Sequence, residues 1–101
     1  MLYAGEKNRV SIQVLGSGGP ELDDQRASSS YLIWLDSKAA ILVDTGNGSG
    51  LNLERSGAKV EDLQAILFTH FHVDHSSDFP AYVKGSFFTS RDEDLMIYGP
   101  D

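Results

Sequence analysis

All three histidines of this chain lie within six residues, and an aspartate lies among them. The four residues are His70, His72, Asp74 and His75, with the spacing H-x-H-x-D-H. Imidazole nitrogens and carboxylate oxygens are the ligands that zinc and related divalent ions take when no thiolate is present. A single histidine in such a place would be an ordinary polar surface residue. Three histidines and an aspartate this close together favour a metal site.

The segment before the histidines determines where they point. Residues 64–69 (QAILFT) form an apolar run without alternation, which predicts a strand covered on both faces. At the end of such a strand, His70 and His72 would face the same side with Cα atoms about 6.5 Å apart, close enough to share one ion. Asp74 and His75 follow where the strand bends, and can reach a second position. This favours two ions about 3.5–4 Å apart, the layout of many hydrolytic sites.

Other stretches predict the elements that carry this cluster. Val10 to Leu15 alternates with period two and ends in a glycine turn, which predicts a strand. Two apolar runs separated by Asp36-Ser37-Lys38 predict a hairpin. Further strands are predicted at 64–69, 87–89 and 95–98, helices at 51–56 (ended by Gly57) and from Ser76 or Ser77 to 84, and one helical turn at 60–63. The alternation predicts an α/β fold with helices on the outer face of a sheet.

Length and composition limit the possible functions. A chain of 101 residues with 41% hydrophobic residues forms at most one small domain or part of a larger one. A net charge of −7 without a Lys/Arg run argues against nucleic-acid binding within this segment. The absence of cysteine excludes disulfides and thiolate ligands.

The sequence also bears on localisation. No apolar run is long enough to span a membrane, and the first 15 residues contain no uninterrupted apolar stretch of the kind found in a signal peptide. The chain is therefore expected to be soluble, without membrane partners. Its compartment stays open: cytoplasmic or, if a leader was removed, periplasmic or secreted.

The segment 69–75 (THFHVDH) resembles the signature of the metallo-β-lactamase superfamily. Asp44, within 42–46 (LVDTG), is similar to the aspartate-glycine turn that precedes the metal motif in that family. Residues 16–20 (GSGGP), Arg26 with the serines at 28–30, and 97–100 (IYGP) are similar to motifs of the branch that contains tRNase Z and arylsulfatase-like and phosphodiesterase-like hydrolases. The resemblance covers nearly the whole chain. It implies that residues 1–101 form the N-terminal half of an αβ/βα sandwich with a mixed sheet, as one incomplete domain.

The resemblance also implies roles for individual residues. His70 and His72 would bind the first metal, and Asp74 and His75 the second. Asp74 would also be catalytic, accepting or relaying a proton of the water that attacks the substrate. Asp44 and Thr69 would hold the ligands in place without touching metal. The implied cofactors are two zinc ions, or manganese or iron in some relatives. The implied substrates are phosphoesters, sulfate esters or related esters, with a small molecule or an ester as the partner.

This sequence departs from the family pattern in several places. The family completes its site with a histidine, a bridging aspartate and a last histidine from later in a longer chain, whereas this chain has no histidine after His75. Residues 1–101 alone are therefore expected to be inactive, with the missing ligands supplied by further polypeptide or a second chain. Val73 stands where the tRNase Z branch usually has glycine, and Asp78 where a glycine often precedes the next helix.

An alternative interpretation comes from the incomplete ligand set. The chain would then be a non-catalytic, truncated metal-binding or structural module. Half a sandwich leaves an apolar sheet face and an unpaired strand edge, so such a module would fold by self-association, as a homodimer or by exchanging strands.

Overall fold

The computed structural model describes residues 9–101. Residues 1–8, which include most of the N-terminal stretch considered above for a leader, lie outside this range. The elements in chain order are β1 (Val10–Gly16), β2 (Ser30–Leu35), β3 (Lys38–Val43), α1 (Ser49–Arg55), the 3-10 turn η1 (Val60–Asp62), β4 (Ala65–Leu67), α2 (Val73–Ser76), α3 (Phe79–Ser86) and β5 (Met96–Tyr98). None of the helices in the described range is long and apolar enough to cross a lipid bilayer.

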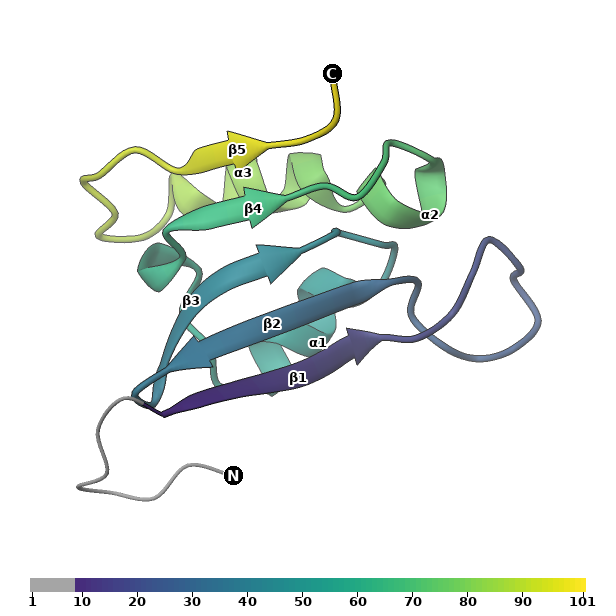
Figure 1. The fold of residues 1–101 in the computed structure, drawn as a ribbon, viewed down its shortest axis with the longest axis horizontal. Coiled ribbons are helices and arrows are strands. Elements are labelled where there is room, and N and C mark those ends of the chain that lie inside the picture. The colour runs from purple at the N-terminus through teal and green to yellow at the C-terminus, as the bar shows by residue number, and fades with distance from the viewer. Residues whose placement is uncertain (1–8) are drawn as a thin grey trace.

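The five strands form one mixed sheet in the order β1-β2-β3-β4-β5 (Figure 1). The first two pairs are antiparallel, whereas β4 runs parallel to both β3 and β5. Parallel neighbours need a crossover, and the segment with α1 and η1 provides it between β3 and β4. The predicted α/β class with a mixed sheet is confirmed.

The hairpin predicted from the two apolar runs is present. β2 and β3 pair antiparallel, and Asp36 and Ser37 form the turn with φ angles of 50° and 70°. Positive φ at both central residues is typical of a two-residue turn whose twist matches that of the strands. The predicted end of the first helix is also correct, because Gly57 has φ 83° just after α1.

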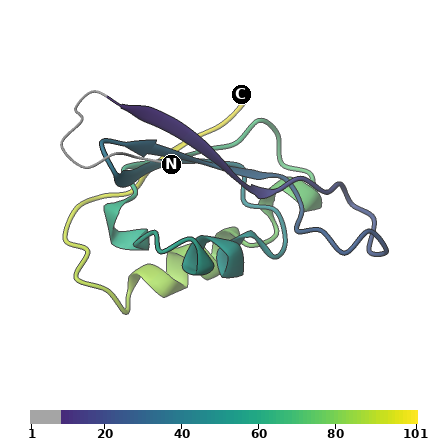
Figure 2. The same ribbon diagram turned by 90° about the horizontal axis from the view of Figure 1, so that it is seen from below.

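All the helices that cover the sheet lie on one of its faces (Figure 2). On that face Leu32, Leu42 and Ile66 are fully buried, and they pack in one cluster with Leu53 of α1 and Tyr82 of α3. The predicted arrangement of helices on one outer face is therefore confirmed. Leu32, Leu42 and Ile66 share this face because they are direct partners on three neighbouring strands.

The opposite face of the sheet is apolar and open within residues 9–101. Two rows of side chains cross all five strands in register: Ile12, Ile33, Ile41, Ala65 and Met96 in one row, and Val14, Tyr31, Val43, Leu67 and Tyr98 in the other. At the edges of the sheet, Ile12 is 67% exposed and Tyr98 is 53% exposed. We call these ten residues the open face. The prediction that residues 64–69 are covered on both faces is wrong for the described part of the chain, because Ala65 and Leu67 lie on the open face and are only half-buried.

Two predictions on the C-terminal half are corrected. The helix predicted to start at Ser76 or Ser77 is α3, which starts later with Asp78 as its N-cap residue, and the separate short helix α2 precedes it. Residues 87–89 form no strand. Instead, the amides of Phe87, Phe88 and Thr89 continue the turns of α3 by donating to carbonyls three residues earlier. Two adjacent phenylalanines favour a strand only where a sheet edge is available, and here they lie 73% and 80% exposed in a turn.

Burial of Tyr82 gives stability a dependence on alkaline pH. Burial raises the pKa of Tyr82 to about 12, with a smaller opposing effect of its hydrogen bond to Ser49. Because the folded chain holds this proton more tightly than the unfolded chain, the stabilisation is full below pH 10 and is lost as pH rises towards 12. We expect urea unfolding of wild type to lose on the order of 2 kcal/mol more than Tyr82→Phe between pH 9 and pH 12. Replacing the exposed Tyr98 by Phe should leave the loss as in wild type, and an equal loss in Tyr82→Phe would refute the assignment.

Candidate metal centre

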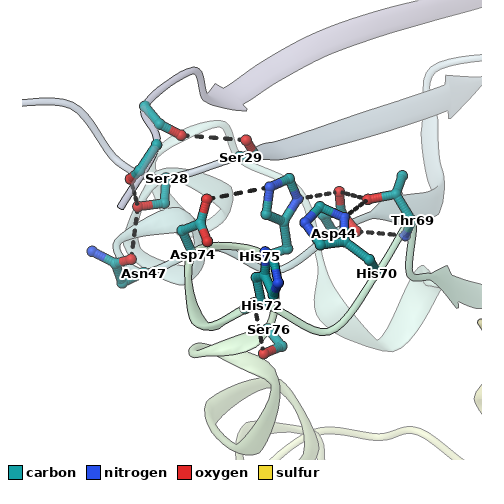
Figure 3. A network of polar contacts seen from close by, with 12 residues as sticks. Ser28, Ser29, Asp44, Asn47, Thr69, His70, His72, Asp74, His75 and Ser76 are labelled. Carbon is teal, nitrogen blue, oxygen red and sulfur yellow. Dashed lines mark hydrogen bonds and ion pairs between the residues drawn. The ribbon is translucent and has the colours of Figure 1, made fainter. Parts of the chain in front are cut away.

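The candidate site lies at the edge of the sheet where parallel strands end together. Asp44 directly follows β3, and the segment from Thr69 to His75 follows β4. Because β3 and β4 are parallel, their carboxyl ends meet at the same edge, which is a common location of ligand sites in α/β sheets. Figure 3 shows these side chains gathered in one place, with the imidazole of His75 between Asp44 and Asp74.

Asp44 holds the two histidine-bearing segments together. Its carboxylate is 2% exposed and accepts three hydrogen bonds: from the Thr69 amide at 2.8 Å, from the Thr69 hydroxyl at 2.7 Å and from Nδ1 of His75 at 2.7 Å. The backbone of Asp44 has φ 62°, a conformation that few residues other than glycine adopt without support. Ser30 supports it by donating its hydroxyl to the Asp44 carbonyl at 2.8 Å.

These hydrogen bonds determine which nitrogen each imidazole presents. Asp44 can only accept when ionised, so Nδ1 of His75 carries the proton and Nε2 is left with the lone pair. The Thr69 hydroxyl donates its one proton to Asp44, so it accepts from Nδ1 of His70 at 3.1 Å. In their neutral forms, both imidazoles therefore have Nε2 as the acceptor nitrogen. A metal-binding histidine is usually fixed in this way by a hydrogen bond at its other nitrogen.

The contact between His75 and Asp74 can be bridged by a proton or by a metal ion. Nε2 of His75 lies 3.3 Å from Oδ2 of Asp74, and the two side chains are 18% and 14% exposed. With Nδ1 donating to Asp44, both of these atoms are acceptors, so a proton or a metal ion must lie between them. Two ligands bound tetrahedrally to one zinc at 2.0–2.1 Å are separated by about 3.3–3.4 Å. The observed separation therefore suits two ligands of one metal.

The other two predicted ligands lie beside this pair. The ring centroids of His70 and His72 are 4.7 Å apart, and those of His70 and His75 are 4.0 Å apart. The prediction that His70 and His72 face the same side agrees with this distance. However, among residues 9–101 no group of three or more histidine, aspartate or glutamate side chains is arranged so that it could hold a metal ion. Only the pair of His75 and Asp74 therefore has a separation that suits one metal ion. The full set of four ligands and the two-metal layout stay predictions.

Sequence reasoning identified Asp44 and Thr69 but missed two supporting residues. The buried Thr45 donates its amide to the His75 carbonyl at 2.7 Å, which ties α2 to the end of β3. Gly46 lies so close to this segment that a Cβ there would be 2.5 Å from the carbonyl oxygen of Asp74. The only available signal was the Asp-Thr-Gly sequence directly after a strand, which indicates a tight turn without saying what it contacts.

The sequence matches known proteins across most of its length. Residues 23–91, more than half of the chain, match the model of the metallo-beta-lactamase superfamily. Ribonuclease Z from Pyrococcus abyssi is 33% identical over 92 residues, and ribonuclease Z from Methanosarcina mazei is 32% identical over 92 residues. These matches cover 91% of this chain and 30% of each relative. The chain therefore spans about a third of the length of these relatives.

Solved structures agree with the fold described above. The metallo-beta-lactamase fold protein YhfI from Bacillus subtilis has a TM-score of 0.77 and 28% identity, covering 91% of this chain and 36% of that one. The short form of human tRNase Z has a TM-score of 0.76 and 27% identity, covering 88% of this chain and 34% of that one. The extent of the family match, with the same arrangement of strands and helices in these neighbours, shows that this chain belongs to the metallo-beta-lactamase superfamily.

Proposed function

We propose that this chain is the N-terminal part of a metal-dependent hydrolase, and that His70, His72, Asp74 and His75 contribute half of its metal ligands. The observation that carries the proposal is the pair of facing acceptors, Nε2 of His75 and Oδ2 of Asp74 at 3.3 Å, held by the buried Asp44. A supported imidazole that faces a carboxylate at this separation offers two acceptor atoms to a metal ion.

The residues of the chain divide the chemistry between them. A bound divalent metal would activate water and polarise the scissile ester bond. Asp44 keeps the Nδ1 proton on His75, and Thr69 does the same for His70, so that each presents Nε2. Asp74 is half-buried beside the site, and its second carboxylate oxygen can accept a proton from the attacking water.

The substrate class that we propose is a small phosphoester, with sulfate esters and related esters as further candidates. The relatives named ribonuclease Z act on RNA by their names, which supports phosphoester chemistry. Two features favour a small ester over a polynucleotide for this segment. The chain carries a net charge of −7, and residues 68–82 around the site contain no lysine or arginine.

Zinc binding and turnover test this proposal separately. We expect residues 1–101 to bind zinc, and the His75→Ala variant to bind it at least about 10-fold more weakly. For turnover, residues 9–101 can replace the matching N-terminal segment of the Pyrococcus abyssi ribonuclease Z. This chimera should hydrolyse bis(p-nitrophenyl) phosphate faster than p-nitrophenyl sulfate, and Asp74→Asn should lower kcat by about 100-fold or more.

The matched control is Asp92→Asn, which removes an exposed carboxylate in the loop before β5. It should change neither zinc affinity nor kcat. Zinc affinity that is equal in wild type and His75→Ala, or a folded chimera with no turnover of either ester, would contradict the proposal.

A second candidate is favoured by the open face. It is a self-associating structural or metal-binding module in which two copies cover each other's apolar sheet surface. The open face carries ten side chains without a charge, so two copies can meet there without bringing their net charges of −7 into the contact. A twofold dimer needs only one such self-complementary patch.

A further inference from the structure

Phe71 lies in the chain between His70 and His72, and its side chain contacts Phe68 and Gly99. Its ring lies 5.3 Å from that of Phe68, which in turn lies 5.3 Å from the ring of Phe79 in α3. Phe68 is 7% exposed and belongs to the core, whereas Phe71 is 58% exposed. This row of rings connects the loop that carries the imidazoles to the interior of the protein.

The far end of the Phe71 ring rests on Gly99. A Cβ built at Gly99 would lie 2.7 Å from Cζ of Phe71, and the three nearest heavy atoms to it all belong to that ring. The backbone of Gly99 is not in the left-handed region, so this glycine is required for space and not for its conformation. The amide of Phe68 donates to the carbonyl of Tyr98 at 2.8 Å, which keeps the two segments side by side.

We propose that Phe71, seated on Gly99, is a positioning residue that turns His70 and His72 to the same side. The loop after β4 has no strand partner to fix its alternation, since β4 ends at Leu67. Phe71 is the middle residue of the three, and contacts that hold its side chain also fix the backbone on both sides of it. The imidazoles on either side then face the opposite direction, with centroids 4.7 Å apart.

A double-mutant cycle tests this positioning role without activity. Gly99→Ala pushes the Phe71 ring off its seat, and Phe71→Ala removes the ring. In each variant we expect the nuclear Overhauser contacts between the His70 and His72 rings to weaken, and zinc affinity to fall by about 10-fold. In the Phe71→Ala background, Gly99→Ala should have no further effect, because the three heavy atoms nearest to the added methyl group all belong to the Phe71 ring.

The control is Gly85→Ala in α3, where an added Cβ meets nothing within 4 Å. It should leave the ring contacts and zinc affinity unchanged, and Phe71→Leu should retain part of both. Ring contacts that are the same in wild type, Gly99→Ala and Phe71→Ala would overturn the inference.

The inference rests on the proposed function, which gives the reason why the two imidazoles are positioned. Failure of the inference and failure of the proposed function give different results. Absence of zinc binding in wild type contradicts the metal site, whereas the ring contacts of the metal-free chain decide the role of Phe71.

Discussion

Replacing Asp44 by asparagine is expected to lower the free energy of unfolding by about 2–4 kcal/mol and to release His75 from its fixed orientation. Asparagine keeps one acceptor, which can still serve the Thr69 amide. In place of Oδ2 it puts an amide group, which donates. That group would face the Thr69 hydroxyl and Nδ1 of His75, both of which donate to Asp44 in wild type. Two donors would therefore lose their buried acceptor.

The size of this effect follows from burial. Asp44 is 2% exposed, so water has little access to the position of its carboxylate. The backbone contributes little to the change, because asparagine tolerates the φ of 62° at least as well as aspartate. The variant therefore measures the effect of losing the carboxylate, with little contribution from the backbone conformation of residue 44.

Asp36→Asn is the matched control. Asp36 also has positive φ, at 50°, but it is exposed in the β2–β3 turn, where its carboxylate accepts the Arg9 amide at 2.8 Å. We expect a change within about 0.5 kcal/mol for Asp36→Asn. Urea denaturation measures both variants, and nitrogen chemical shifts of the His75 ring report its tautomer. Equal stability losses at the two positions, or an unchanged His75 tautomer in Asp44→Asn, would contradict the role given to Asp44.

The sequence was sufficient to predict the elements whose causes are local. The hairpin follows from apolar runs on both sides of Asp36 and Ser37, and the cap at Gly57 follows from the ease with which glycine takes positive φ. The cluster of candidate ligands was also predictable, because all four follow one apolar strand within a few residues.

What sequence could not predict depends on contacts between distant segments. The three bonds to Asp44 join residues 25 to 31 positions apart, and no local pattern encodes them. The seat of Phe71 on Gly99 likewise appears only once β5 lies beside β4. Residues 64–69 were predicted to be covered on both faces because they are apolar. An apolar sequence does not distinguish a covered face of a strand from an uncovered one. The strand predicted at 87–89 failed because α3 extends through Ser86 and its turns take up the following amides.

A single lysine on the open face should decide whether copies of this chain associate through it. Ile12 lies on β1 and pairs with Ile33, and its side chain is 67% exposed. If two copies bury this face, Ile12→Lys places an unpaired charge in the contact and should raise the Kd of the dimer by at least about 100-fold. The same change takes the net charge from −7 to −6, which weakens repulsion between copies. Loss of the dimer would then result from the lysine on the open face and not from the change in net charge.

Leu51→Lys is the control, because it makes the same charge change at a residue of α1 that is 52% exposed in the helix layer. Sedimentation equilibrium over a range of concentrations should show dimers for wild type and Leu51→Lys, and monomers for Ile12→Lys. A wild-type chain that stays monomeric, or two lysine variants with the same oligomeric state, would contradict the proposal of a self-associating module. The two candidate functions also separate in the Asp74→Asn variant. A module held together by its open face should dimerise as wild type does, since Asp74 lies at the sheet edge, whereas a hydrolase chimera with the same change should fold and lose turnover.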